Sequence, residues 1–159
     1  MTTLTNSQSE PQPLIGALAP AYASLSGVTE ALLRAAAGAF LIPHGAQKLF
    51  GWFGGGGLAG TGQFFETQLG YSDGWLAALA AGSIEVFGGV LLALGLFTRP
   101  VAMVVAVFLA IAASAHLGAG FFWDAGGWEY PVLWTLVVLH FAVRGGGRYS
   151  LDRVIGREL

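Results

Sequence analysis

Hydrophobic residues gather in four long stretches, and polar residues concentrate between them and at the two ends of the chain. The stretches cover residues 28–50, 75–97, 100–117 and 128–143. Because a helix needs about 20 mainly apolar residues to cross the hydrocarbon core of a bilayer, each stretch is a candidate membrane span. The fourth is the shortest, and we expect it to extend into its flanks or to thin the bilayer locally.

The pattern inside these stretches predicts helices rather than strands. Residues 101–113 are apolar without interruption, whereas the strand of a membrane barrel alternates apolar and polar positions. A helix also satisfies its backbone polar groups internally, as lipid requires. Only Thr98 and Arg99 separate the second and third stretches, so these helices must be antiparallel neighbours. We therefore predict an all-α fold, a bundle of four transmembrane helices within residues 27–145.

The two ends of the chain are predicted to lie outside this bundle. Residues 1–26 begin with a polar run, and Pro11, Pro13 and Pro20 argue against a continuous helix there. We interpret this segment as a polar N-terminal tail. Residues 146–159 are interpreted as a C-terminal tail on the cytoplasmic side.

The first long loop, residues 51–74, has a pattern of its own. Phe64, Phe65 and Leu69 recur at helical spacing beside polar residues, which predicts a short amphipathic helix at the membrane surface. Three tryptophans fall at the expected membrane boundary and suit an interfacial belt: Trp75, Trp123 and Trp128.

Composition agrees with a membrane environment. The chain is 55% hydrophobic and 10% charged, whereas soluble domains are about one-quarter charged. The formal net charge of -2 gives no electrostatic support for nucleic-acid binding. The sequence has no cysteine, which excludes disulfides, thiol catalysis and cysteine-ligated metal centres.

Basic residues predict the orientation of the bundle, because cytoplasmic loops are enriched in lysine and arginine. With four spans, five arginines share one side: Arg99, Arg144, Arg148, Arg153 and Arg157. The opposite side receives mainly acidic residues: Glu66, Asp73, Asp124 and Glu129. We expect a multi-pass protein of the bacterial inner (cytoplasmic) membrane with both termini in the cytoplasm, and with the loops at 51–74 and 118–127 outside.

Two blocks of residues resemble the DoxX family of membrane proteins. The first lies in and after the first stretch: Arg34, Gly38, Phe40, Leu41, His44, Gly45, the run from Gln47 to Gly51, Gly54 to Gly57, Leu58, Gly60, Thr61, Phe64 and Phe65. The second lies at the end of the second stretch: Glu85, Gly88, Gly89, Leu94, Gly95, Leu96, Thr98 and Arg99. The likeness covers residues 31–102 well and the rest loosely.

The resemblance implies a four-helix integral membrane protein. It also implies an association with quinone-linked redox chemistry, thiosulfate oxidation or oxidative-stress complexes. Many members of the family have no assigned reaction, so the resemblance says more about the fold than about the function.

Arg34 and Glu85 are ionisable residues inside predicted spans, and such residues are functional candidates by default. At about 1.5 Å per residue, Arg34 would lie in the inner half of the membrane and Glu85 near its centre, within reach of the arginine side chain. We hypothesise an Arg34–Glu85 ion pair. It would either lock two helices together or shape a polar pocket for a head group or a proton.

Two histidines and a lysine are expected near the outer side. His44 and Lys48 are one helical turn apart, and His116 ends the third stretch at a similar predicted depth. If they converge, these side chains can hydrogen-bond a quinone carbonyl, and histidine can carry a proton near neutral pH. The alternative is two interfacial histidines with unrelated partners.

Other ligands have weaker support in the sequence. Two facing histidines could also ligate a haem iron, but no second histidine pair accompanies them. No dense group of histidine and carboxylate residues predicts a metal site. His140, in the fourth stretch, is interpreted as a packing residue, and Gly54 to Gly57 lack the lysine and serine or threonine that complete a phosphate loop.

Three functions remain open from the sequence. The first is a membrane subunit linked to quinone redox or oxidative-stress chemistry, without independent catalysis, whose candidate ligand-binding residues are Arg34, His44, Lys48, Glu85 and His116. Its partners would be the lipid bilayer and other membrane or peripheral redox proteins. The second is a structural or assembly subunit of a larger membrane complex. The third is a small transporter, although no clear internal repeat supports it.

Overall fold

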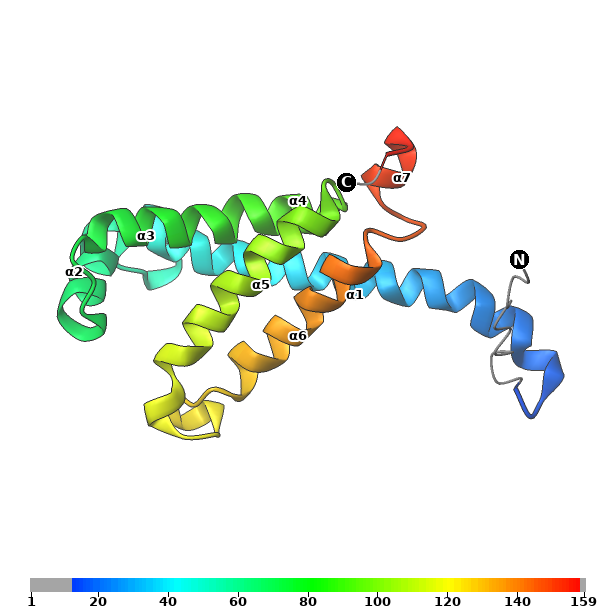
Figure 1. The fold of residues 1–159 in the computed structure, drawn as a ribbon, viewed down its shortest axis with the longest axis horizontal. Coiled ribbons are helices and arrows are strands. Elements are labelled where there is room, and N and C mark those ends of the chain that lie inside the picture. The colour runs from blue at the N-terminus through cyan, green and yellow to red at the C-terminus, as the bar shows by residue number, and fades with distance from the viewer. Residues whose placement is uncertain (1–12, 158–159) are drawn as a thin grey trace, which may run out of the picture.

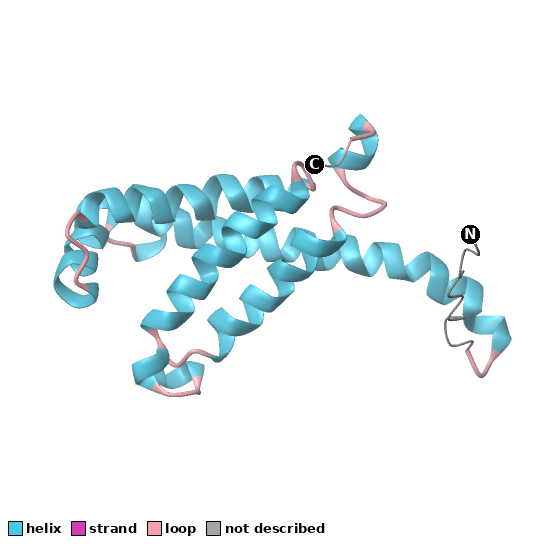
Figure 2. Cartoon of the chain, viewed as in Figure 1, coloured by secondary structure: helices cyan, strands magenta, loops and turns pink. Residues whose placement is uncertain are grey.

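The computed structural model describes residues 13–157, and every regular element in that part of the chain is helical (Figure 2). The main helices are α1 (Ala19–Phe50), α2 (Gly57–Leu69), α3 (Gly74–Ser83), α4 (Gly89–Leu94), α5 (Thr98–Ala115), α6 (Glu129–Arg144) and α7 (Leu151–Ile155). A π-helical turn, Ile84–Gly88, joins α3 to α4 as one continuous rod. Short 3₁₀ turns at Gly16–Leu18, Trp52–Gly54, Leu117–Ala119 and Trp123–Ala125 complete the set.

Three helical segments of the described chain are long and apolar enough to cross a membrane: Gly16–Phe50, Gly74–Leu94 and Thr98–Ala115. The fourth predicted span corresponds to α6, which has 16 residues. At 1.5 Å per residue α6 is about 24 Å long, less than the roughly 30 Å hydrocarbon core. The helix exists where the apolar pattern predicts it, but it falls short of a full span.

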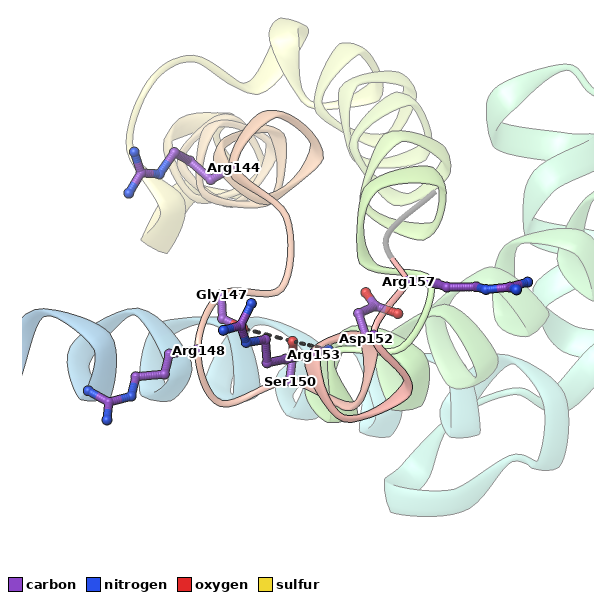
Figure 3. A pocket seen from close by; sticks show the side chains of 8 residues that line it. Arg144, Gly147, Arg148, Ser150, Asp152, Arg153 and Arg157 are labelled. Carbon is purple, nitrogen blue, oxygen red and sulfur yellow. Dashed lines mark hydrogen bonds between the residues drawn. The ribbon is translucent and has the colours of Figure 1, made fainter.

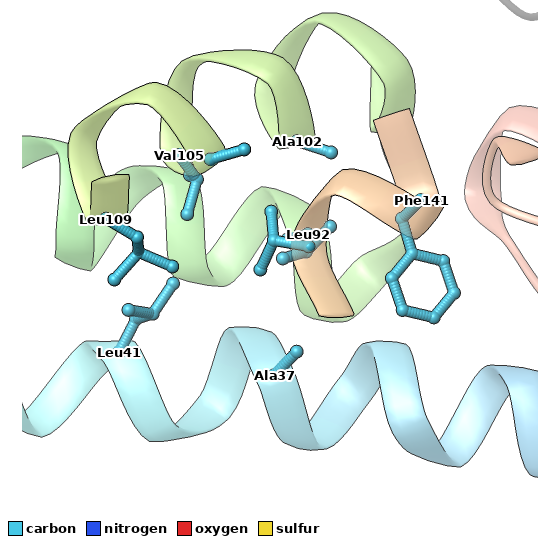
Figure 4. Close-up of a cluster of buried hydrophobic side chains, with 9 residues drawn as sticks. Ala37, Leu41, Leu92, Ala102, Val105, Leu109 and Phe141 are labelled. Carbon is cyan, nitrogen blue, oxygen red and sulfur yellow. The ribbon is translucent and has the colours of Figure 1, made fainter. Parts of the chain in front are cut away.

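The helices form two antiparallel pairs that cross at an angle (Figure 1). In one pair, α1 lies along the rod made by α3 and α4, with α2 at its far end. The other pair is the α5–α6 hairpin. The core lies where the pairs meet, and it takes Ala37 and Leu41 from α1, Leu92 from α4, Val105 from α5 and Phe141 from α6 (Figure 4).

Glycines fix the register of α1 against the α3–α4 rod. A Cβ at Gly45 would lie 2.7 Å from the carbonyl oxygen of Gly82, and one at Gly89 would lie 2.7 Å from that of Gly38. Any larger side chain would push the helices apart, so these contacts hold two backbones together in the way that small residues do in membrane helix pairs.

The outward faces of the helices are apolar. Large hydrophobic side chains are exposed along all the main helices, among them Leu32, Phe40, Phe87, Val107, Ile111, Leu136 and Val143. Exposed surface of this kind is what a bilayer covers.

The N-terminal tail is shorter than predicted, because α1 begins at Ala19 rather than near residue 28. Pro20 lies in the first turn, where a helix needs no backbone N–H from it. Ser24 and Ser26 donate their hydroxyls to carbonyls three residues earlier, which hides their polarity within the helix. Pro13 precedes the helix, and Pro11 lies outside the described residues.

Two other flanking segments also carry structure. The predicted amphipathic helix of the first loop is present as α2. The C-terminal segment, predicted to be a tail, contains α7, and it folds back onto the turn between α4 and α5.

Candidate functional site

Lys48 and Glu85 form a buried ion pair between α1 and the π-helical turn. The Lys48 Nζ atom lies 2.8 Å from Glu85 Oε1 and 2.7 Å from Oε2. Glu85 is only 5% exposed, although it sits in the middle of the Gly74–Leu94 span. A carboxylate at that depth is costly to bury without a cation beside it, which explains why the two side chains meet.

The pair is incompletely satisfied. Lys48 donates a well-formed hydrogen bond to Glu85 Oε1, while Oε2 is at ion-pair distance but receives no well-directed donor. The next contact of Nζ is a long one, 3.4 Å to the carbonyl oxygen of His44. A lysine has three N–H donors, so the pair retains unused hydrogen-bonding capacity.

The π-helical turn gives Glu85 its position. Over Ile84–Gly88 the rod widens by one residue, and Glu85 faces α1 from this turn. Such turns are uncommon and occur often at functional sites. On α1, His44 is exposed and lies one turn before Lys48.

Arg34 forms a second buried site, nearer the end of the α3–α4 rod. Its Nη1 atom donates to the backbone carbonyl oxygens of Leu92 and Ala93, both at 2.7 Å. Its Nη2 atom donates to the backbone carbonyl oxygen of Tyr149 at 2.7 Å. Nε has no partner among the described residues. Arg34 thus satisfies the last carbonyls of α4 and ties the C-terminal segment to them.

Asp152 completes this second site. Its carboxylate accepts from the backbone N–H groups of Phe97 and Thr98 at 2.7 and 2.9 Å, and from the Thr98 hydroxyl at 2.7 Å. The backbone N–H of Asp152 donates to the carbonyl oxygen of Gly95. Gly95 and Phe97 have left-handed backbone angles, so α4 ends at Leu94 and α5 starts at Thr98, two residues earlier than predicted.

The predicted Arg34–Glu85 ion pair is wrong. Glu85 pairs with Lys48, and Arg34 binds backbone carbonyls about two turns further along the rod. The prediction placed each apolar stretch symmetrically in the bilayer, whereas the glycine contacts set a different register. With Gly45 beside Gly82 and Gly38 beside Gly89, Arg34 comes level with the end of α4.

His116 lies apart from Lys48 and His44. It follows α5, and its Nδ1 atom lies 2.8 Å from the carbonyl oxygen of Gly126, with its ring against Trp123. These partners belong to the tip of the α5–α6 hairpin, which diverges from α1 toward that end (Figure 1). His140 packs against Phe141 and lies 3.8 Å from Glu30, which Arg144 also contacts at 3.3 Å.

Comparison with known proteins decides the family. The DoxX family profile matches residues 30–118, which include α2, α3, α4, α5 and most of α1. The chain belongs to the DoxX family. It is 37% identical over 107 residues to an uncharacterized protein of Haemophilus influenzae, across 60% of this chain and 78% of that protein. No solved structure matches the chain.

The matched region of this DoxX protein contains Arg34, Lys48 and Glu85, but not Asp152. Sequence reasoning missed Asp152 because it follows the last apolar stretch. A local signal was available, because serine is a common residue at the N-cap of a helix. Ser150 has this role in the structure, where its side chain accepts a hydrogen bond from the backbone N–H of Arg153 at the start of α7. In the described part of the DoxX chain, no three histidine, cysteine or carboxylate residues are grouped to hold a metal ion.

Proposed function

We propose that this DoxX-family protein is a membrane subunit for quinone-linked redox or oxidative-stress chemistry, without independent catalysis. Lys48, Glu85 and His44 would bind a quinone head group. The observation that carries the proposal is the Lys48–Glu85 pair, in which a carboxylate buried in the middle of one membrane span meets a partly exposed lysine near the end of another. The family resemblance supports the choice of ligand, because it implies quinone-linked chemistry.

The chemistry of the donor set fits a quinone. A quinone head group offers carbonyl oxygens, which need hydrogen-bond donors in an apolar environment. Lys48 has a third N–H beyond those directed at Glu85 Oε1 and the His44 carbonyl, and the imidazole of His44 supplies another donor. The Oε2 atom of Glu85, which receives no well-directed hydrogen bond, can accept one from the hydroxyl of a reduced head group.

The roles of the protein residues follow from these contacts. When bound, the quinone supplies the capacity to carry electrons together with protons. Glu85 holds the Lys48 ammonium in place, so that Nζ can donate to a ligand oxygen. A ring nitrogen of His44 can donate a further hydrogen bond to the head group.

The membrane arrangement belongs to the same proposal. We infer that α6 completes a four-span bundle with help from its flanking residues, in the bacterial inner membrane. The arginines at 99, 144, 148, 153 and 157 would then share the cytoplasmic side with both termini. Cysteine labelling with a membrane-impermeant reagent tests this: a cysteine at Val154 should react only after the membrane is opened, and one at Leu69 should react in intact cells.

The binding site is tested with purified protein in nanodiscs loaded with a ubiquinone or menaquinone analogue. Lys48→Met and His44→Ala should each lower the bound quinone per protein at least 10-fold. His116→Ala serves as the matched control, because His116 contacts the hairpin tip and should leave binding unchanged. Equal quinone content in the wild type and Lys48→Met would refute the proposed site.

One feature favours the alternative, an assembly subunit of a larger membrane complex. The first turns of α1 extend past the other helices (Figure 1), and apolar side chains there are exposed, including Leu18, Tyr22 and Leu25. Such a surface suits a neighbouring protein. Photo-crosslinking from position 22 in native membranes should trap a specific partner, and crosslinks to lipid alone would count against this function.

A further inference from the structure

A hollow of about 770 Å³ lies where the C-terminal segment folds back beside α6 (Figure 3). Four arginines line it: Arg144 at the end of α6, Arg148 in the connecting loop, Arg153 in α7 and Arg157 after α7. Asp152 is the acidic residue in its lining. None of the residues proposed to bind a quinone lines this hollow.

Among residues 13–157, few acidic groups compensate the positive charge of the hollow. The Asp152 oxygens are already used by Phe97 and Thr98, and its charge faces the buried guanidinium of Arg34. Arg144 contacts Glu30 on α1. Within residues 13–157, the side chains of Arg148, Arg153 and Arg157 form no ion pair, and all three are exposed.

The hollow lies at the boundary of the membrane. Asp152 binds the turn that follows Leu94, the last residue of the second candidate span. Apolar side chains next to the arginines are strongly exposed, Val143 at 68% and Val154 at 81%. Guanidinium groups at this level, with apolar surface beside them, match both parts of a phospholipid: a phosphate and the start of its acyl chains.

We propose that this hollow binds the head group of an anionic glycerophospholipid. Arginine suits this role because its guanidinium forms two parallel hydrogen bonds to phosphate oxygens. Arg148 and Arg157 project to opposite sides of the hollow, with Arg153 between them (Figure 3). The four arginines therefore spread positive charge around the hollow, and the exposed apolar side chains next to them in the sequence, Val143 and Val154, suit the glycerol and upper acyl carbons.

The test is native mass spectrometry of the intact protein titrated with phosphatidylglycerol or with zwitterionic phosphatidylcholine of the same acyl chains. The wild type should bind phosphatidylglycerol at least 10-fold more tightly than phosphatidylcholine. Arg153→Gln should lower that preference about 3-fold, and the combined Arg148→Gln, Arg153→Gln and Arg157→Gln variant should abolish it. Arg99→Gln removes the same charge near the same boundary, outside the lining of the hollow, and should keep the full preference.

Three results would overturn the proposal. The first is equal binding of both lipids to the wild type. The second is a preference that survives the triple variant, or that Arg99→Gln and Arg153→Gln reduce equally, since either would point to general surface charge. The third is displacement of the lipid by millimolar inorganic phosphate, which would identify a free-anion site. If the triple variant does not fold, the Arg153→Gln and Arg99→Gln pair still decides the question.

Discussion

The two ionisable sites of this protein differ in what their charged groups contact. Arg34 donates three short hydrogen bonds to backbone carbonyls and faces Asp152, which itself accepts three bonds from the turn before α5. The Lys48–Glu85 pair makes one well-directed hydrogen bond between its side chains and leaves Oε2 without a donor. Each site leaves one buried polar atom without a hydrogen bond, Nε of Arg34 and Oε2 of Glu85. Arg34 is bound by backbone carbonyls, whereas Lys48 is bound mainly by a carboxylate side chain.

Their positions along the spans sharpen the contrast. Arg34 joins chain segments that meet where α4 ends, so its bonds serve connections between helices. Glu85 lies mid-span in a π-helical turn, where it closes no helix end and joins no loop. An ionisable group buried away from the helix ends is the stronger candidate for function in a membrane helix.

Replacement of Arg34 should have the largest effect on stability. Arg34→Met leaves the carbonyls of Leu92, Ala93 and Tyr149 without their donors, and hydrogen bonds to charged groups contribute about 1.5–3 kcal/mol each. We expect a loss of about 4 kcal/mol in the free energy of unfolding, measured by denaturant titration in detergent micelles. Arg148→Met is the control, and a variant at position 34 as stable as that control would remove the distinction between the two sites.

The Lys48–Glu85 pair should behave as a coupled unit. Lys48→Met leaves a buried carboxylate without its cation, and we expect a cost of about 3 kcal/mol. Combining it with Glu85→Gln should bring stability back to within about 1 kcal/mol of the wild type, because no isolated charge remains. Quinone binding should stay lost in the double variant. Additive costs in this double-mutant cycle would mean that the two groups do not interact.

The glycine contacts that set the register predict an intermediate effect. In Gly38→Ala the new methyl group meets the backbone of Gly89 and Ala93, so α1 and α4 must separate, at a cost of about 2 kcal/mol. Gly60, in α2, has open space around its Cβ position, and Gly60→Ala should be neutral or stabilise by about 0.5 kcal/mol. Thermal unfolding of both variants checks this, and similar midpoints would show that the contact is dispensable.

His116→Ala should have the smallest effect. It removes one contact to the Gly126 carbonyl in a partly exposed loop, so we expect a change below about 1 kcal/mol in stability. The same variant should leave quinone content unchanged. A large loss of bound quinone would instead return His116 to the proposed site and require the hairpin tip to approach α1.

The sequence predicts the helices well because apolar runs and lipid solvation leave few alternatives. The positions of α5 and α6 come within two residues of the predicted spans, and α2 appears in the loop where aromatic spacing predicts it. The beginning of α1 differs from the prediction because Pro20 occupies a first-turn position, where proline does not break a helix.

Side-chain partners were harder to predict than helices. The depth of a residue in the membrane, estimated from its position in an apolar stretch, does not identify the partners of Arg34 or Glu85. An error of two helical turns in that depth replaces one partner with another. The register depends on which glycines face each other, and a single sequence with 25 glycines does not reveal this. The role of Asp152 depends on a fold-back of the C-terminal segment, which no hydrophobic pattern records.

The position of Asp152 and Tyr149 near the C-terminal end of the chain has a consequence for biosynthesis. Arg34 leaves the ribosome long before either residue, and enters the bilayer without its last carbonyl acceptor and its counter-charge. Until translation has passed residue 152, the turn after α4 also lacks the carboxylate that ties down its N–H groups. The junction of α1, α4 and α5 is therefore complete only after α7 has been synthesised and has folded back onto the turn after α4.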